Sequence, residues 1–160
     1  RRAEQVSAER RPATPQPDES AISDQRSARP RVLVVEDAAD TLEMLRVFLT
    51  ARGYEVTACA SAAEALRVAA AGHFDIIVSD IGLPETDGYE LLGRIRRELP
   101  HLARVPALAV TGYAAERDGE LARAAGFAAH IAKPFEPAEL ADSIARVLAP
   151  DEPDADGAAT

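Results

Sequence analysis

Short apolar runs alternate along the chain with segments whose apolar residues recur every three or four positions. The runs lie near residues 32–36, 54–59, 75–79, 106–110 and 128–132, and we expect a β-strand at each. Helical spacing is clearest in three groups: Leu42, Leu45, Phe48 and Leu49; Leu91, Leu92, Ile95 and Leu99; and Leu140, Ile144, Val147 and Leu148. Alanine-rich segments near 61–71 and 115–125 predict two further helices with weaker apolar faces.

A glycine stands between a predicted helix and the following strand at Gly53, Gly72 and Gly126. We expect all three to be left-handed caps at the C-termini of their helices. Five βα units with short connections predict a parallel sheet covered by helices on both faces. The fold class is therefore α/β, a doubly wound five-stranded parallel sheet with five helices, and the strand order 2-1-3-4-5 fits this count.

Apolar content divides the chain into three parts. Residues 1–30 contain four prolines and few large aliphatic residues, so we expect a disordered linker or tail there. Residues 150–160 carry four acids and no aliphatic side chain larger than alanine, which predicts an acidic disordered tail. The folded domain is accordingly expected at 31–149.

Composition narrows the functional classes. A chain of 160 residues with 47% hydrophobic residues suits one domain with an ordinary core. The net charge of −9 argues against binding to nucleic acid or to an anionic membrane. One cysteine, Cys59, excludes an intrachain disulfide and a cysteine cluster for zinc, and suits a reducing cytoplasm. No membrane-length apolar stretch or signal peptide is recognisable.

Polar residues that bear reactive groups stand at the ends of four predicted strands. They are Glu36 and Asp37, Asp80, Thr111, and Lys133. In the order 2-1-3-4-5 the first and third strands are neighbours, so the three acids would converge outside the carboxyl ends of the strands, where ligands bind in such sheets. Acids, a hydroxyl and an amine together predict a site for Mg²⁺ and a phosphoryl group.

These residues resemble the receiver domains of two-component response regulators, which have a flavodoxin-like fold. The resemblance covers nearly all of 31–149. It is carried by four motifs in order: Val34-Val35-Glu36-Asp37; Ser79-Asp80-Ile81-Gly82-Leu83-Pro84 with Asp87-Gly88; Val110-Thr111-Gly112; and Lys133-Pro134-Phe135. Each motif alone is weak evidence, whereas the ordered set at strand ends is specific.

The resemblance implies a role for each site residue. Asp80 is the expected phosphoacceptor, and Thr111 and Lys133 are expected to contact the phosphoryl oxygens. Thr111 is also the expected switch hydroxyl, which a phosphoryl group on Asp80 would pull inward. Mg²⁺ is the expected cofactor, held directly by Asp37, Asp80 and the backbone carbonyl of Gly82, and through water by Glu36. The family also leads us to expect a cis peptide bond between Lys133 and Pro134.

Three positions concern switching or phosphoryl lifetime. The family places Tyr or Phe at a switch position that is occupied here by His130, which leaves a pH-sensitive or otherwise altered readout open. Gly82 and Tyr113 occupy the two positions that affect phosphoryl lifetime in the family. The bulk of Tyr113 would screen the phosphoryl group from water.

Several residues have simpler interpretations when taken singly. Glu36 and Asp37 would serve as an N-cap pair for the first helix, and Asp80 and Asp87 as turn residues. Three histidines lie on different predicted elements without metal-ligand spacing, so we expect satisfied or solvent-facing rings: His73, His101 and His130. Cys59 is expected to be a small buried residue at a strand end.

The predicted function is a phosphoacceptor switch rather than an enzyme. It would take a phosphoryl group from a phosphohistidine of a histidine kinase or histidine phosphotransfer protein, and act on a downstream output protein or domain. A hydrolase with an aspartyl-phosphate intermediate is expected to have a second acid two residues after the nucleophile. Gly82 occupies that position, which argues against this class. A degenerate receiver that only makes protein contacts is the remaining alternative, against which the complete set of site residues argues.

We expect a bacterial, cytoplasmic domain without direct membrane contact. The chain would be either a stand-alone regulator or the C-terminal receiver of a hybrid histidine kinase. The linker before Pro30 and the start at Arg1 favour the second origin, in which that linker tethers the domain to a membrane sensor.

Overall fold

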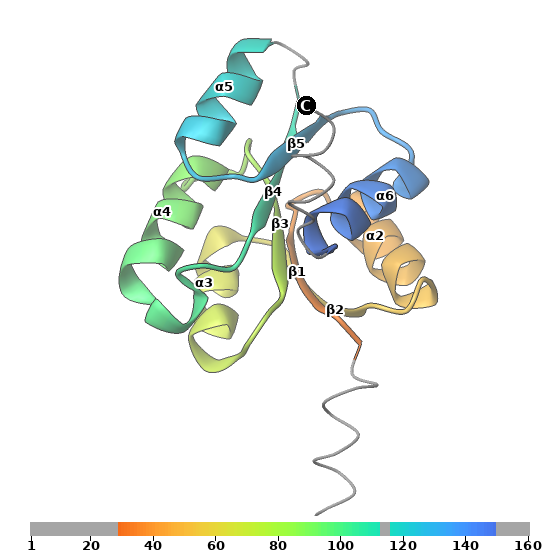
Figure 1. Cartoon of the computed structure of the whole chain (residues 1–160), viewed down its shortest axis with the longest axis horizontal. Helices are drawn as coiled ribbons and strands as arrows, with labels where there is room; N and C mark the ends of the chain where they lie inside the picture. Colours follow the sequence, from red (N-terminus) through yellow and green to blue (C-terminus); the bar gives the residue numbers. More distant parts are fainter. Residues whose placement is uncertain (1–28, 113–115, 150–160) are drawn as a thin grey trace, which may run out of the picture.

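The structure is a computed structural model that describes residues 29–112 and 116–149, without the side chains of 116–119. Its five strands form one parallel sheet in the order β2-β1-β3-β4-β5 (Figure 1). The strands are β1 (Arg31–Val35), β2 (Glu55–Cys59), β3 (Ile76–Asp80), β4 (Ala107–Thr111) and β5 (Ala129–Ala132). The predicted fold class and strand order are confirmed.

Helices cover both faces of this sheet, as Figure 1 shows. The helices α2 (Ala39–Ala51) and α6 (Pro137–Leu148) lie on one face. The other face carries α3 (Ala62–Ala71), α4 (Gly88–Glu98) and α5 (Glu116–Ala124). All five predicted helices are present, including both alanine-rich ones, and a short 3₁₀ turn at Pro100–Leu102 was not predicted. No helix in the described ranges has the length and apolar character needed to cross a bilayer.

Two apolar cores lie on either side of the sheet. Along β1, Leu33 and Val35 pack under α3 and α4, whereas Val32 and Val34 pack under α2 and α6. Both faces of the central strands are therefore buried, which explains why they read as continuous apolar runs rather than as alternating ones. Because all five strands run in the same direction, their carboxyl ends lie at one edge of the sheet.

Three predicted strands are displaced by one residue, β1 toward the N-terminus and β3 and β4 toward the C-terminus, and the last two shifts matter for the site. β3 and β4 begin and end one residue later than the runs at 75–79 and 106–110 suggested. Asp80 is paired in register with Val110, and Thr111 with Ala132. Both polar residues are thus the last residues of their strands, and the sheet itself holds their backbones.

The glycine caps are confirmed at two of the three positions. Gly53 and Gly126 have positive φ angles of 99° and 106°. The prediction for Gly72 is wrong, because this residue is extended with φ −127° and ψ 172°. A Cβ added there would lie 3.3 Å from the Phe74 ring and 3.4 Å from the Val68 carbonyl oxygen, which is a tight contact and not a collision.

Side-chain caps fix the starts of two helices near the site. The hydroxyl of Ser61 accepts a hydrogen bond from the Glu64 amide at the start of α3, and the Asp87 carboxylate accepts one from the Glu90 amide at the start of α4. The first residue before α2 is Ala38. Glu36 and Asp37 are therefore not its N-cap pair, and that simpler interpretation is wrong.

Candidate functional site

The carboxyl ends of β1, β3, β4 and β5 surround a single cleft of about 530 Å³. Its walls are formed by Glu36, Asp37, Ala38, Asp80, Ile81, Gly82, Tyr89, Thr111, Gly112, Leu121 and Lys133. Every candidate residue that the sequence placed at these strand ends lines this cleft. The sheet order explains the convergence, because β1 and β3 are adjacent and β4 follows β3.

Asp80 lies at the floor of the cleft with only 5% of its surface exposed. Its Oδ1 accepts a hydrogen bond of 3.0 Å from the Gly82 amide, and its Oδ2 lies 3.2 Å from the Lys133 Nζ. The Ser79 hydroxyl donates to the Asp80 carbonyl oxygen at 3.0 Å. Backbone and side chain are therefore both held, so the carboxylate is presented to the cleft in one orientation.

Lys133 is the residue that follows β5, and its side chain lines the cleft. Its Nζ lies 3.2 Å from the Glu36 Oε1 as well as 3.2 Å from the Asp80 Oδ2. The backbone amide of Lys133 donates to the Thr111 carbonyl oxygen at 2.7 Å, which joins the ends of β4 and β5. The peptide bond between Lys133 and Pro134 is cis, as the resemblance predicted.

Burial and charge shift the titration of two of these groups. Burial is the main cause that raises the pKa of Glu36, and the negative charge of Asp80 raises it further, although the Ala38 amide and Lys133 act in the opposite direction. Partial burial lowers the pKa of Lys133, but the charges and hydrogen bonds of Asp80 and Glu36 outweigh it and raise that pKa above its usual value. The cleft thus favours the protonated, cationic lysine.

The three acids form the one group of potential metal-ligating side chains found among the described residues. One carboxylate oxygen from each of Glu36, Asp37 and Asp80 lies within 4.8 Å of the others. Glu36 and Asp80 are buried, whereas Asp37 is exposed at the mouth. Three carboxylates facing one lysine leave the cleft net negative, and hard oxygen ligands of this kind fit Mg²⁺. Coordination by the Gly82 carbonyl stays a prediction.

The other predicted residues differ in how they relate to the cleft. Thr111 is 2% exposed and lines the cleft at the end of β4. His130 is exposed on β5 and is absent from the cleft walls. Tyr113 lies outside the described residues, so its screening role stays a prediction.

Two cleft residues that lie on helices were missed by the sequence reasoning. Tyr89 reaches the cleft from the first turn of α4, and Leu121 from α5, where it is 46% exposed. Tyr89 follows the Asp87-Gly88 motif directly, and this proximity was the available signal. Helix positions are hard to assign to a strand-end site from sequence, because the rotation of the helix decides which side chains face it.

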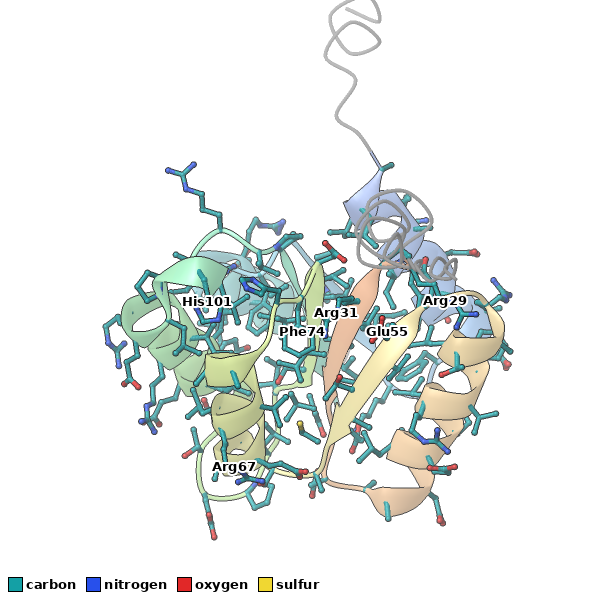
Figure 2. All side chains as sticks on the ribbon, turned by 90° about the horizontal axis from the view of Figure 1, so that it is seen from below. Arg29, Arg31, Glu55, Arg67, Phe74 and His101 are labelled. Atoms are coloured by element: carbon teal, nitrogen blue, oxygen red, sulfur yellow. The ribbon has the colours of Figure 1, made fainter. Side chains whose placement is uncertain are left out.

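Two residues outside the cleft behave as predicted. The His101 Nε2 lies 2.9 Å from the Ala69 carbonyl oxygen and 3.1 Å from that of Gly72, so this ring is satisfied by hydrogen bonds. Figure 2 shows it from below, the side on which β1 begins, together with Arg31 and Phe74. Cys59 is fully buried at the end of β2, and burial raises the pKa of its thiol to about 11.

The sequence and the fold both match known proteins. A family model described as the response regulator receiver domain matches residues 32–145. An uncharacterized 14.6 kDa protein of Leptolyngbya boryana is 42% identical over 116 residues, which cover 72% of this chain and 88% of that protein. The polar-differentiation response regulator DivK of Brucella ovis is 34% identical over 117 residues, 73% of this chain and 94% of DivK.

A solved structure shows the same likeness. It is the receiver domain of a sensor histidine kinase of Pseudomonas aeruginosa PAO1, with a magnesium ion coordinated in its active-site cleft. The TM-score is 0.68 at 35% sequence identity, and the match covers 76% of this chain and 98% of that domain.

Proposed function

Because the chain belongs to the family of response regulator receiver domains, we propose that it is a magnesium-dependent phosphoacceptor switch in which Asp80 receives the phosphoryl group. The observation that carries this proposal is the position of Asp80. Its carboxylate is nearly buried, is oriented by Gly82 and Lys133, and has two further acids beside it. A buried carboxylate surrounded in this way is arranged for chemistry rather than for stability.

The transfer itself forms one bond and breaks one bond. A carboxylate oxygen of Asp80 attacks the phosphorus of a phosphohistidine, and the phosphorus–nitrogen bond of the donor breaks. The electron pair of that bond returns to the donor imidazole, which leaves neutral when it has taken up a proton. Because attacking and transferring groups are both anionic, cationic groups must offset their repulsion.

Lys133 and Thr111 supply part of that compensation. The Lys133 Nζ already lies 3.2 Å from the Asp80 Oδ2, so it is placed to pair with a phosphoryl oxygen bound there. The Thr111 hydroxyl, from the neighbouring strand end, is assigned a hydrogen bond to another phosphoryl oxygen. Both side chains come from rigid strand ends, which keeps the positions of their donors fixed.

The acidic cluster is assigned to Mg²⁺. Asp37 and Asp80 would hold the ion directly, Glu36 would hold it through water, and the Gly82 carbonyl would complete the protein ligands. Bound Mg²⁺ supplies positive charge beside the phosphoryl oxygens. The oxygen separations of at most 4.8 Å support this assignment, as does the net negative charge of the site.

The phosphoryl donor is proposed to dock beside the mouth of the cleft. A second cleft of about 490 Å³ adjoins the first and shares Gly112 and Lys133 with it. Its wall includes Met44 of α2, which is 38% exposed, and Val47 on the next turn is 53% exposed. A phosphohistidine must come within bonding distance of Asp80, so a histidine kinase or phosphotransfer protein would cover this apolar surface while it delivers the phosphoryl group.

The experiment that tests the proposal is intact-protein mass spectrometry after incubation with acetyl phosphate. We expect the native chain to gain one phosphoryl group in Mg²⁺ and none in excess chelator. Asp80→Asn should gain none. Asp142→Asn, an exposed acid on α6, is the matched control and should be labelled like the native chain.

Two outcomes would contradict the proposal in different ways. Equal labelling of Asp80→Asn would place the phosphoryl group on another residue. No labelling of the native chain, together with no Mg²⁺ binding by calorimetric titration, would favour the degenerate receiver that makes only protein contacts. The test applies equally to a stand-alone regulator in the cytoplasm and to the receiver of a hybrid kinase.

A further inference from the structure

The start of α4 is fastened to the backbone at Asp80. The Gly88 amide donates a hydrogen bond of 2.9 Å to the Ile81 carbonyl oxygen. A Cβ added at Gly88 would lie only 2.5 Å from the Asp80 carbonyl oxygen and 2.9 Å from the Ile81 Cα. The first turn of α4 therefore rests directly on the strand end that carries the acceptor, with no room between them for a side chain.

Tyr89, the next residue, connects the cleft with the segment that leads into β5. It lines the cleft and packs, partly buried, against the core under α3 and α4. Its ring makes an edge-to-face contact with Phe127, with ring centroids 6.3 Å apart and planes at 72°. Phe127 is 3% exposed, and its amide donates to the Ala122 carbonyl oxygen of α5 at 2.9 Å. One aromatic side chain thus touches the cleft and the junction of α5 with β5.

His130 has no comparable position. It is exposed on β5 and does not line the cleft, whereas Tyr89 is the one aromatic cleft residue in the ranges that the structure describes. The position to which the resemblance assigned the aromatic readout is therefore occupied by an exposed side chain that does not line the cleft.

We propose that Tyr89, through its ring contact with Phe127, couples phosphorylation of Asp80 to the surface formed by α5 and β5. The inference rests on the proposed function, because it needs a phosphoryl group on Asp80. Three new oxygens in the cleft need partners, so the side chains in its walls must rearrange. The start of α4 is fixed by Gly88, so the Tyr89 ring moves rather than the helix.

The packing around Phe127 makes that movement consequential. Protein interiors are close-packed, so a displaced ring forces its buried neighbours into another arrangement rather than leaving a gap. Phe127 stands two residues before the first residue of β5 and is hydrogen-bonded to the last turn of α5. A change in the Tyr89 contact is therefore transmitted to both elements at once.

The test uses the uniformly ¹⁵N-labelled chain with Mg²⁺ and acetyl phosphate. Amide chemical shifts of Phe127 and Ile131 are measured before and after phosphorylation, and intact mass on the same samples gives the extent of labelling. The variants are Tyr89→Leu, which removes the ring, Tyr89→Phe, which keeps it, and His130→Ala. A thermal melt of each variant shows that it is folded.

A T-shaped aromatic pair shifts an equilibrium by a factor of about 2 to 10. When the shift change is scaled to the extent of labelling given by intact mass, we therefore expect Tyr89→Leu to lose at least half of it at Phe127 and Ile131. Tyr89→Phe and His130→Ala should retain it. A full shift change in Tyr89→Leu, or its loss in Tyr89→Phe or His130→Ala, would overturn the inference. Labelling of the native chain without any shift change would overturn the coupling alone. Failure of the native chain to become labelled would overturn the proposed function, and the coupling with it.

Discussion

Gly88 is the residue at which fold and site depend most directly on one another. A methyl group at this position would collide with backbone atoms of Asp80 and Ile81 at 2.5 Å and 2.9 Å, and backbone cannot rotate away as a side chain can. Gly93, in the middle of the same helix, meets only the Arg97 Nη1 at 3.3 Å, at the end of a flexible side chain. The packing of α4 therefore requires a glycine at position 88 but not at position 93.

We expect Gly88→Ala to destabilise the protein by about 2 kcal/mol or more, because the collision must separate α4 from the end of β3. Gly93→Ala is the matched control and should be neutral or stabilising by up to about 1 kcal/mol, since alanine favours a helix interior. Urea denaturation followed by circular dichroism gives both values. Equal stabilities for the two variants would show that α4 does not rest on Asp80 as described.

At the residue scale the sequence was most informative where chemistry demands a particular side chain. Glu36, Asp37, Asp80, Thr111 and Lys133 stand at strand ends, and their meeting in one cleft follows from the strand order. What escaped prediction depended on packing. The rotation of a helix brings Tyr89 into the cleft, and the backbone at Gly72 is extended rather than left-handed.

At the scale of elements, α2 presents an apolar surface next to the site. Met44 and Val47 are two of the three large apolar residues that are strongly exposed in the described ranges, and Leu121 at the cleft is the third. The opposite side of α2 buries Leu45 and Leu49 in the core. Exposed apolar residues gathered on one side of a helix are typical of a partner surface.

We expect the double variant Met44→Ala, Val47→Ala to slow phosphoryl transfer from a phosphorylated histidine donor about five- to thirtyfold, as for the loss of one or two contact residues. Labelling by acetyl phosphate should be unchanged, because that donor needs no docking. Alanine favours helices, so unfolding of α2 does not confuse the result. The measurement is the initial rate of transfer, with the donor found by screening histidine kinases and phosphotransfer proteins.

Arg67→Ala on α3 provides the control for this experiment, since it shortens an exposed helical side chain on the opposite face of the sheet. It should transfer like the native chain. Equal slowing by Arg67→Ala, or an equal loss with acetyl phosphate in the double variant, would argue against a donor surface on α2.

Element types were predictable because the patterns have a physical period, whereas boundaries were less so. The helices with regular apolar spacing were found, and the two alanine-rich ones were found from composition and position. β3 and β4 end one residue later than predicted, on Asp80 and Thr111. A strand extends onto a polar residue when the adjacent strand reaches far enough to form backbone hydrogen bonds with it. The hydrophobic pattern of the sequence does not show how far this pairing extends.

At the scale of the whole molecule, the site is a concentration of negative charge in a chain whose net charge is already −9. Two of the three acids are buried beside one lysine. In the absence of a bound cation, such a cluster lowers the stability of the folded state. A cation that binds to the folded state restores this stability by mass action. The disorder expected at 1–30 and 150–160 was predicted from composition alone. Because residues 1–28 and 150–160 lie outside the described residues, it stays a prediction.

Glu36 allows a test of whether the buried negative charge lowers the stability of the folded state. Its folded pKa is raised above the ordinary value of 4.5, chiefly by burial. Between pH 4.5 and that raised pKa the folded state binds more protons than the unfolded state, so stability falls as pH rises through this window and stays lower at pH 7. Glu36→Gln removes the charge, so without Mg²⁺ we expect it to be more stable than the native chain at pH 7, by about 0.5 to 2 kcal/mol. Below pH 4.5 the difference should disappear.

Added Mg²⁺ should reverse this order. At a hundredfold excess over its dissociation constant, a ligand of the folded state adds about 2.7 kcal/mol. The native chain should gain more than Glu36→Gln, which has lost a charge from the proposed ligand set. Thermal melts in chelator and in Mg²⁺ at several pH values measure all of these differences. Glu43→Gln on α2, an exposed acid whose pKa is lowered by its hydrogen bond to Arg46, is the control and should not gain stability at pH 7. A Glu36→Gln variant that is less stable than the native chain in chelator at pH 7 would contradict this prediction. It would show that Lys133 fully compensates the buried charge of Glu36, and that repulsion among the acids does not destabilise the metal-free protein.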